Sequence, residues 1–98
     1  MTYEARARAC LQWALEDHGP GMEYTEYLRL WRAETGWLSW CLHSERTYRG
    51  PYGSPRLQAS YAASVGVARR RLVTLERLRR ARGIPPRADG ARFLSPVA

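Results

Sequence analysis

The chain has 98 residues, a hydrophobic fraction of 45% and a formal net charge of +7. This length allows one small domain with a single core, and 11% aromatic residues argue against a disordered chain. No apolar run approaches the roughly 20 residues of a membrane span, and the N-terminus lacks the apolar stretch of a secretory signal. We therefore expect a cytoplasmic protein that makes no contact with a membrane.

The positive charge is concentrated in the C-terminal half. Residues 1–55 carry six arginines against seven acidic residues, whereas residues 56–98 carry ten arginines against two acidic residues. All sixteen basic residues are arginine, and the forked guanidinium suits phosphates and guanine edges. This pattern predicts a nearly neutral scaffold joined to a face that binds a polyanion.

The N-terminal half is expected to form a helical, aromatic-rich scaffold over residues 1–46. Apolar residues recur there at helical spacing in three segments, namely 3–18, 22–34 and 37–48. Thr2 is the expected N-cap of the first helix, and Gly19-Pro20 its stop. Thr35-Gly36 either breaks the second helix or only weakens it.

The tryptophans support two interpretations. All four lie between Trp13 and Trp40, where aromatic side chains can form a core or an interface that stacks on a partner. Their helical periodicity favours the core. Trp31, Trp37 and Trp40 are the residues that would anchor a protein partner if the interface interpretation holds.

No catalytic or metal-binding pattern is present. The two cysteines, Cys10 and Cys41, fall on apolar stripes and are expected to be buried free thiols. Together with His18 and His43 they lack the ligand spacing of a zinc site. Because paired carboxylates and phosphate-binding glycine loops are also missing, we predict no enzyme activity, no cofactor and no metal.

Gly66 decides the organisation of the C-terminal half. The segment 47–55 has turn chemistry and ends in Ser54-Pro55, which is typical of a helix start. The helix that follows either continues through Gly66 as one amphipathic helix or stops near residue 64. In the second case a turn at Gly66 leads into another helix over 68–81. Residues 83–98 are expected to form an extended tail, with Phe93 and Leu94 docking on the body.

The window from Gln58 to Arg77 resembles the helix-turn-helix of bacterial and phage regulators. An alanine precedes the glycine by four residues, and apolar residues occupy the positions that two crossing helices share; these are Tyr61, Ala62, Val65, Val67, Leu72 and Leu75. With the segment upstream, residues 37–82 look like region 4 of sigma factors and the phage antitermination regulators built on it. The proline-rich loop 49–55 departs from that pattern, which puts the subfamily in doubt.

The resemblance implies an all-α domain of four to five helices with a helix-turn-helix at 54–82. It also implies a DNA-binding transcriptional regulator of phage or bacterial type, with 68–81 as the recognition helix in the major groove. The DNA-binding residues would then be Arg56, Gln58, Arg69, Arg70, Arg71, Thr74, Arg77, Arg79 and Arg80. Arg69 and Arg70 are expected to read bases, and most of the other arginines to neutralise phosphates.

A second hypothesis is a small regulator that binds a protein such as RNA polymerase through its aromatic N-terminal half. Regulators of this kind often form homodimers, and the N-terminal helices are the expected dimer surface. An exposed aromatic patch within residues 13–42 would favour the protein partner, whereas burial of those aromatics would favour a plain DNA-binding domain.

Overall fold

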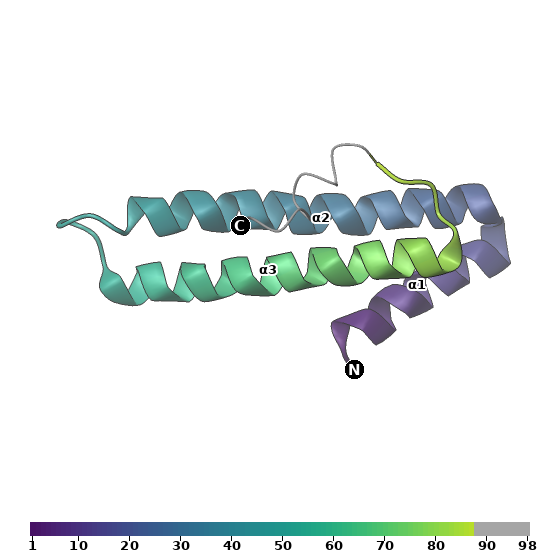
Figure 1. Cartoon of the computed structure of the whole chain (residues 1–98), viewed down its shortest axis with the longest axis horizontal. Helices are drawn as coiled ribbons and strands as arrows, with labels where there is room; N and C mark the ends of the chain where they lie inside the picture. The colour runs from purple at the N-terminus through teal and green to yellow at the C-terminus, as the bar shows by residue number, and fades with distance from the viewer. Residues whose placement is uncertain (88–98) are drawn as a thin grey trace.

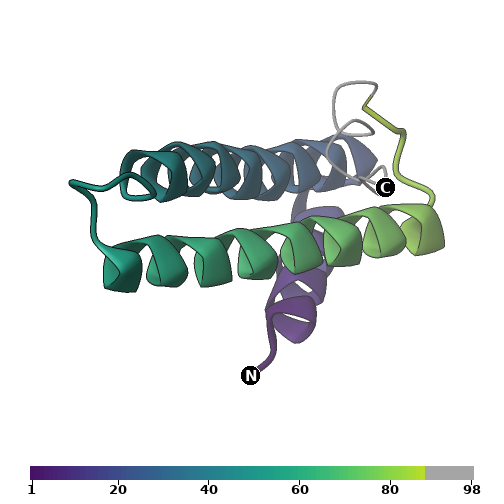
Figure 2. The same ribbon diagram turned by 60° about the vertical axis from the view of Figure 1, so that its left-hand side comes forward.

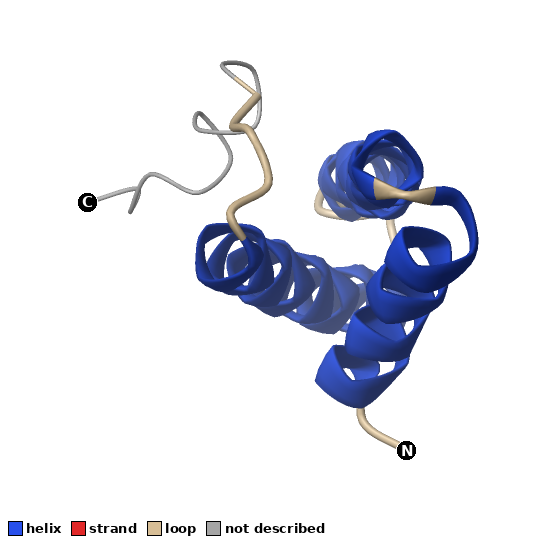
Figure 3. Ribbon diagram, turned by 90° about the vertical axis from the view of Figure 1, so that its right-hand side faces the viewer, coloured by secondary structure: helices blue, strands red, loops and turns tan. Residues whose placement is uncertain are grey.

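The computed structural model describes residues 1–87, which form three helices: α1 (Tyr3–His18), α2 (Pro20–Thr47) and α3 (Pro55–Arg82). The helices α2 and α3 form a long antiparallel hairpin, and α1 crosses one end of it (Figure 1). Viewed along the hairpin, the three helices surround a common core (Figure 3). The expected all-α class is confirmed, whereas the expected number of four to five helices is wrong for the described residues.

Local chemistry fixes the helix ends at the expected places. The hydroxyl of Thr2 accepts a hydrogen bond from the backbone N–H of Ala5 at 3.1 Å, and that of Ser54 accepts one from Leu57 at 3.2 Å. Gly19, with a φ of 87°, ends α1 and directly precedes α2. These signals are local, which explains why the sequence alone locates them.

The sequence left open whether Thr35-Gly36 breaks the second helix, and the structure shows no break there; the break expected at Gly66 is wrong. Residues 35–36 lie inside α2, and Gly66 lies inside α3 without a left-handed backbone. The helix-turn-helix expected at 54–82, with separate helices at 55–64 and 68–81, is therefore replaced by one continuous helix. A glycine inside a helix costs only about 1 kcal/mol, and packing against α2 on both sides of Gly66 offsets that cost.

The hairpin is held by apolar positions that alternate at spacings of three and four residues on both helices. This spacing keeps one stripe of each helix facing the other, as in a coiled coil. The stripe of α2 includes Tyr27, Trp31, Leu38 and Cys41, and that of α3 includes Ala68, Leu72, Leu75 and Leu78. Helix α1 adds Ala7, Leu11 and Ala14 at one end of the hairpin.

The antiparallel register is defined by side-chain pairs along the whole hairpin. Tyr48 stacks on Tyr61 beside the connecting loop, with ring centroids 5.8 Å apart. At the opposite end, Arg82 donates to Glu23 at 2.7 Å. Because a shift of one helix by one residue would break both contacts, the seam is strongly specified.

Helix α1 divides the hairpin into two halves, as Figure 2 shows. We call residues 20–37 with 68–82 the proximal half, because α1 packs there. Residues 38–47 with 55–67 form the distal half, which consists of two helices alone. The described part of the tail returns to the proximal half, where Ile84 is buried and Arg87 lies over the ring of Trp31. The remainder of the expected tail, including Phe93 and Leu94, lies outside the described residues.

Candidate nucleic-acid interface

The outward side of α3 carries a row of arginines at helical spacing. We call this row, formed by Arg69, Arg70, Arg77 and Arg80, the arginine face; all four side chains are exposed. Since Gly66 does not interrupt α3, the row lies on one continuous helix and spans about 16 Å. Val73, which is 54% exposed, lies between the two pairs.

The centre of the arginine face is shallowly hollowed. A depression of about 370 Å³ is lined by Arg69, Arg70, Val73, Thr74 and Arg77. Guanidinium groups therefore surround an apolar floor formed by Val73 and the methyl group of Thr74. Such a surface can contact a phosphate backbone at its rim and a base or a thymine methyl at its centre.

Arg69 and Arg70 differ from the other arginines in the proximal half of α3 in having no internal partner. Within the described chain, neither forms an ion pair or a side-chain hydrogen bond that would occupy its guanidinium. Their charge is therefore available to an external anion without breaking a contact of the fold. They are also the two residues that we expected to read bases.

Most of the remaining predicted arginines are committed to acidic partners. Arg77 pairs with Glu4 of α1 at 2.6 Å, and Arg80 pairs with Glu76 at 3.0 Å. Both guanidiniums are largely exposed, with 61% and 75% of their side-chain surface accessible. Arg77 can exchange the Glu4 carboxylate for a phosphate at little cost, because exposed ion pairs are weak. Glu76, the partner of Arg80, has only 19% of its side chain exposed and also binds Arg79.

Arg79 and Arg71, which we predicted to contact DNA, form contacts within the fold, and their side chains are less accessible than those of the arginine face. The side chain of Arg79 is only 12% exposed, and it donates to Glu76 and to the backbone oxygen of Ile84. Hydrogen bonds from Arg79 lower the pKa of Glu76 below its usual value. Arg71 pairs with Glu34 on α2, and its guanidinium lies over the Tyr3 ring.

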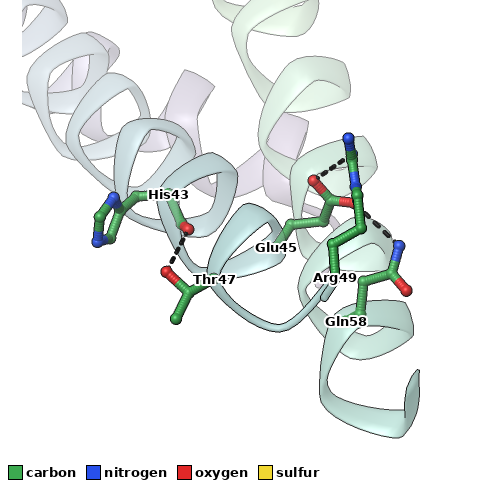
Figure 4. Close-up of polar contacts among 5 residues, drawn as sticks. All are labelled: His43, Glu45, Thr47, Arg49 and Gln58. Carbon is green, nitrogen blue, oxygen red and sulfur yellow. Dashed lines mark hydrogen bonds and ion pairs between the residues drawn. The ribbon is translucent and has the colours of Figure 1, made fainter. Parts of the chain in front are cut away.

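Gln58 and Arg56 lie in the distal half, away from the arginine face. Gln58 donates to Glu45 at 3.1 Å, and Arg49 donates to the same carboxylate (Figure 4). These hydrogen bonds lower the pKa of Glu45. Arg56 is exposed, but it lies thirteen positions before Arg69 on the same helix, which is about 20 Å along the axis. The structure therefore does not bring these two residues to the proposed interface.

Two of the tryptophans fit the core interpretation, and the other two fit the interface interpretation. Trp31 is 7% exposed, and Trp37 is partly buried and packs against the core. Trp13 and Trp40, by contrast, are 56% and 59% exposed. Trp13 lies on α1 and Trp40 on the distal half of α2, so the exposed aromatics occur at separate places rather than throughout the scaffold.

The acidic partners on α1 and α2 are the feature that sequence reasoning missed. Glu4, Glu23 and Glu34 each meet an arginine of α3. A count of net charge treats these arginines as available to bind an external anion, although they form ion pairs within the fold. An antiparallel alignment of the two stripes could have found the pairs on α2, since acidic positions of α2 then face basic positions of α3.

Other site types find no support in residues 1–87. No group of three or more histidine, cysteine or acidic side chains in that range could hold a metal ion. Cys41 is buried, and burial raises the pKa of its thiol, while Cys10 is half-buried. Among the described helices, none has the combination of length and apolar character needed to cross a membrane.

The chain has no detectable similarity to known proteins in three comparisons. No family model, curated protein or solved structure matches it.

Proposed function

We propose that this chain binds double-stranded DNA through the arginine face of α3, as a small sequence-specific transcriptional regulator of bacterial or phage type acting in the cytoplasm. The observation that carries the proposal is the pair Arg69 and Arg70, which are exposed and have no acidic partner within residues 1–87. Arg77 and Arg80 extend the same face. The continuous helix takes the place of the helix-turn-helix as the element that meets DNA.

The charge distribution supports this surface over others. Helix α3 carries eight arginines and one acidic residue, Glu76. Glu34 and Glu23 of α2 pair with Arg71 and Arg82 on the inner sides of α3. The two arginines in the proximal half of α3 without an acidic partner in the described residues, Arg69 and Arg70, lie on its outer side. A polyanion is the natural partner for such a surface, and phosphate contacts would dominate its affinity.

The shape of the surface favours duplex DNA. The major groove of B-DNA is about 12 Å wide and accepts an α-helix, and α3 presents its exposed side over about three turns. Arg69 and Arg70 are placed to contact guanine edges, with Arg77 and Arg80 on phosphates. Duplex RNA has a deep and narrow major groove, so we expect it to bind more weakly.

The experiment compares the double variant Arg69→Ala/Arg70→Ala with the control Arg32→Ala/Arg46→Ala. The control removes the same charge from exposed arginines of α2 that form no ion pair within the described residues. Binding to a short labelled duplex is measured by fluorescence anisotropy over a series of salt concentrations. The first variant should bind about tenfold more weakly with little change in the salt slope, because these two arginines are proposed to contact bases, whereas the control should change the affinity much less.

Sequence preference is tested by selecting bound sequences from random duplex DNA. An enriched site that is lost in the Arg69→Ala/Arg70→Ala variant supports base reading by these residues. Equal loss of affinity in the two double variants would show that only net charge matters. If the wild-type chain binds no duplex even at low salt, the DNA proposal is wrong.

Trp13 and Trp40 do not form one patch, but each is an exposed aromatic side chain, and this supports a second candidate function, binding to a protein such as RNA polymerase. Large exposed aromatics are common anchors of protein interfaces. Purified bacterial core RNA polymerase should then bind the wild-type chain, and it should bind the Trp40→Ala variant more weakly. DNA binding by the same variant should be unchanged, because Trp40 is on α2. The same exposed side chains could support a homodimer, which sedimentation of wild type and Trp13→Ala would reveal.

A further inference from the structure

The outward side of α1 presents a large aromatic residue at its centre. Trp13 is 56% exposed, and Ala9, one helical turn before it, is exposed on the same side. The Trp13 ring makes a T-shaped contact with the ring of His18, with centroids 5.3 Å apart. This contact restricts the indole in the free chain. A side chain that is already restricted loses less entropy when it enters an interface.

A hollow of about 390 Å³ lies beside Trp13, between α1 and α2. It is lined by Ala9, Cys10 and Trp13 of α1 and by Glu26 and Arg29 of α2. The two charged residues form an ion pair with each other, in which Arg29 Nε donates to Glu26 Oε2 at 2.9 Å. Their charges are therefore satisfied at the rim, and the α1 side of the hollow is largely apolar. A hollow of this kind suits a large apolar side chain.

The charges on the outward side of α1 run from positive to negative along the helix. Arg6 lies near its start, and Glu16 and Asp17 lie in its last turn. All three are exposed, and within residues 1–87 none of them forms an ion pair; Glu16 accepts a hydrogen bond from the neutral side chain of Gln12 at 2.7 Å. The helix macrodipole disfavours acidic side chains at the C-terminal end. The stability of α1 alone therefore does not explain this arrangement.

The same positions are self-complementary when two copies of α1 are aligned antiparallel. About a two-fold axis near the middle of the helix, position 9 of one copy faces position 13 of the other, and position 6 faces position 16. Ala9 then meets Trp13 of the second copy, which enters the hollow. In the same register Arg6 meets the acidic pair Glu16 and Asp17 of the second copy. One alignment therefore fills the hollow and pairs the charges.

We infer that two copies of this chain associate through the outward sides of their α1 helices, each placing Trp13 in the hollow of the other. Such a contact is isologous and closes at two chains. Because it involves one 16-residue helix and the adjoining side of α2, it is small, and we expect a dissociation constant in the micromolar range. The inference defines the interface of the homodimer that Trp13 supports, and it does not depend on DNA binding.

The first test reverses the charges and measures the dimer by sedimentation velocity. In Arg6→Glu alone, and in Glu16→Arg/Asp17→Arg alone, like charges face each other in both halves of the contact. Each variant should therefore dimerise about tenfold more weakly, or worse. An equimolar mixture of the two variants restores opposite charges in both halves, so it should form dimers as the wild type does. The control Arg32→Glu changes the same charge on α2 and should leave dimerisation unchanged.

The second test removes the apolar contact. Trp13→Ala should weaken the dimer about thirtyfold, as for a central aromatic anchor. Ala9→Glu keeps Trp13 but places a charge in the hollow, and it should weaken the dimer to a similar extent. Both residues are exposed, so the variants should keep the fold, which circular dichroism checks.

Three results would overturn the inference. They are a wild-type chain that stays monomeric at about 1 mM, a dimer that Trp13→Ala leaves intact, and a mixture of the charge-reversed variants that stays monomeric. The Arg69→Ala/Arg70→Ala variant should dimerise like the wild type. Failure of DNA binding and failure of this interface are therefore measured separately.

Discussion

The proximal and distal halves of the hairpin are built from the same two helices but differ in how they are stabilised. In the proximal half α1 completes a three-helix core, in which Leu72 and Leu75 are fully buried. In the distal half two helices face each other alone, and their contacts include the stacked pair Tyr48–Tyr61 and the polar group around Glu45. Leu38 and Cys41 are buried in the distal half, but beyond them polar and aromatic contacts take the place of a larger apolar core.

The arginine face belongs to the half with the stronger core. Its residues, from Arg69 to Arg80, lie on the exposed side of the stretch of α3 whose inner side buries Leu72, Leu75 and Leu78. Burial of the inner stripe keeps this part of α3 rigid, so exposed arginines can be held in fixed positions without being buried. The distal half offers no comparable row, since its outward side on α3 is mostly alanine and serine. The difference predicts that stability and binding both depend most on the proximal half.

The largest contrast should come from truncating one apolar residue in each half. Leu72→Ala removes a side chain with no exposed surface, and should lower the free energy of unfolding by about 2–5 kcal/mol. Val65→Ala removes a half-buried side chain from the distal half and should cost less than about 1.5 kcal/mol. Urea unfolding followed by circular dichroism measures both. Equal losses would contradict the division into a strong and a weak half.

The second contrast concerns ion pairs at the two ends of the hairpin. In the pair Arg82–Glu23 the side chains are 16% and 8% exposed, so Arg82→Ala leaves a buried carboxylate and should cost about 2 kcal/mol. Arg49 at the distal end is 64% exposed, so Arg49→Ala should cost clearly less. The same unfolding assay applies, and a larger loss for Arg49→Ala would reverse the expected order.

Acidic residues of the two halves should respond to pH in opposite directions. The pKa of Glu34 is raised above its ordinary value of 4.5, mainly by burial, so its contribution to stability is full below that value and is lost as pH rises through the folded pKa. The pKa of Glu45 is lowered, mainly by Arg49, so its contribution is present above 4.5 and is lost as pH falls.

Unfolding of Glu34→Gln and Glu45→Gln between pH 3 and pH 7 tests these signs. Relative to the wild type, Glu34→Gln should become more stable as pH rises, and Glu45→Gln less stable. Parallel curves for the two variants would show that these carboxyl groups do not differ in this way.

The smallest expected effect tests the continuity of α3. A Cβ atom at Gly66 would meet only the end of the Arg70 side chain, at 3.4 Å. Gly66→Ala should therefore stabilise the protein by about 0.5–1 kcal/mol through helix propensity. Gly36→Ala, where nothing lies near the added atom, is the matched control in α2 and should give a similar gain. A clear loss of stability at Gly66 alone would indicate a turn there.

Local signals in the sequence were sufficient for much of the fold. The helix starts at Thr2 and Ser54 were predicted, because a hydroxyl that caps a helix acts within three residues of itself. The all-α class followed from periodicity. Leu72 and Leu75 were assigned to the buried stripe of the last helix, and both are fully buried.

The internal breaks could not be judged from local signals. Gly66 and Gly36 weaken a helix, yet whether the helix continues depends on the packing that each side of the glycine makes with a partner. That packing is set by the match between the stripes of α2 and α3, which are far apart in the chain. A glycine at the predicted turn position was therefore compatible with both interpretations, and the helix-turn-helix was the wrong one.

The candidate interface was predicted only in part for the same reason. Arg69 and Arg70 were correctly expected to face outward, because helical spacing relative to Leu72 and Leu75 decides that. The partners of Arg71 lie on α1 and α2 and depend on tertiary contacts, whereas those of Arg79 are the nearby Glu76 and Ile84. Sequence reasoning counted the charge of these arginines without the acidic groups that occupy them.

The loop between α2 and α3 has a practical consequence for engineering. Tyr52 in this loop is fully exposed, while the register of the hairpin is defined by side chains along the two helices. A peptide inserted beside Tyr52 should therefore leave the alignment of α2 and α3 intact. A fluorophore attached there would sit at the end of the molecule opposite the junction of α1 and α2, along its 52 Å axis. It would report the orientation of α3 on a bound partner without touching the arginine face.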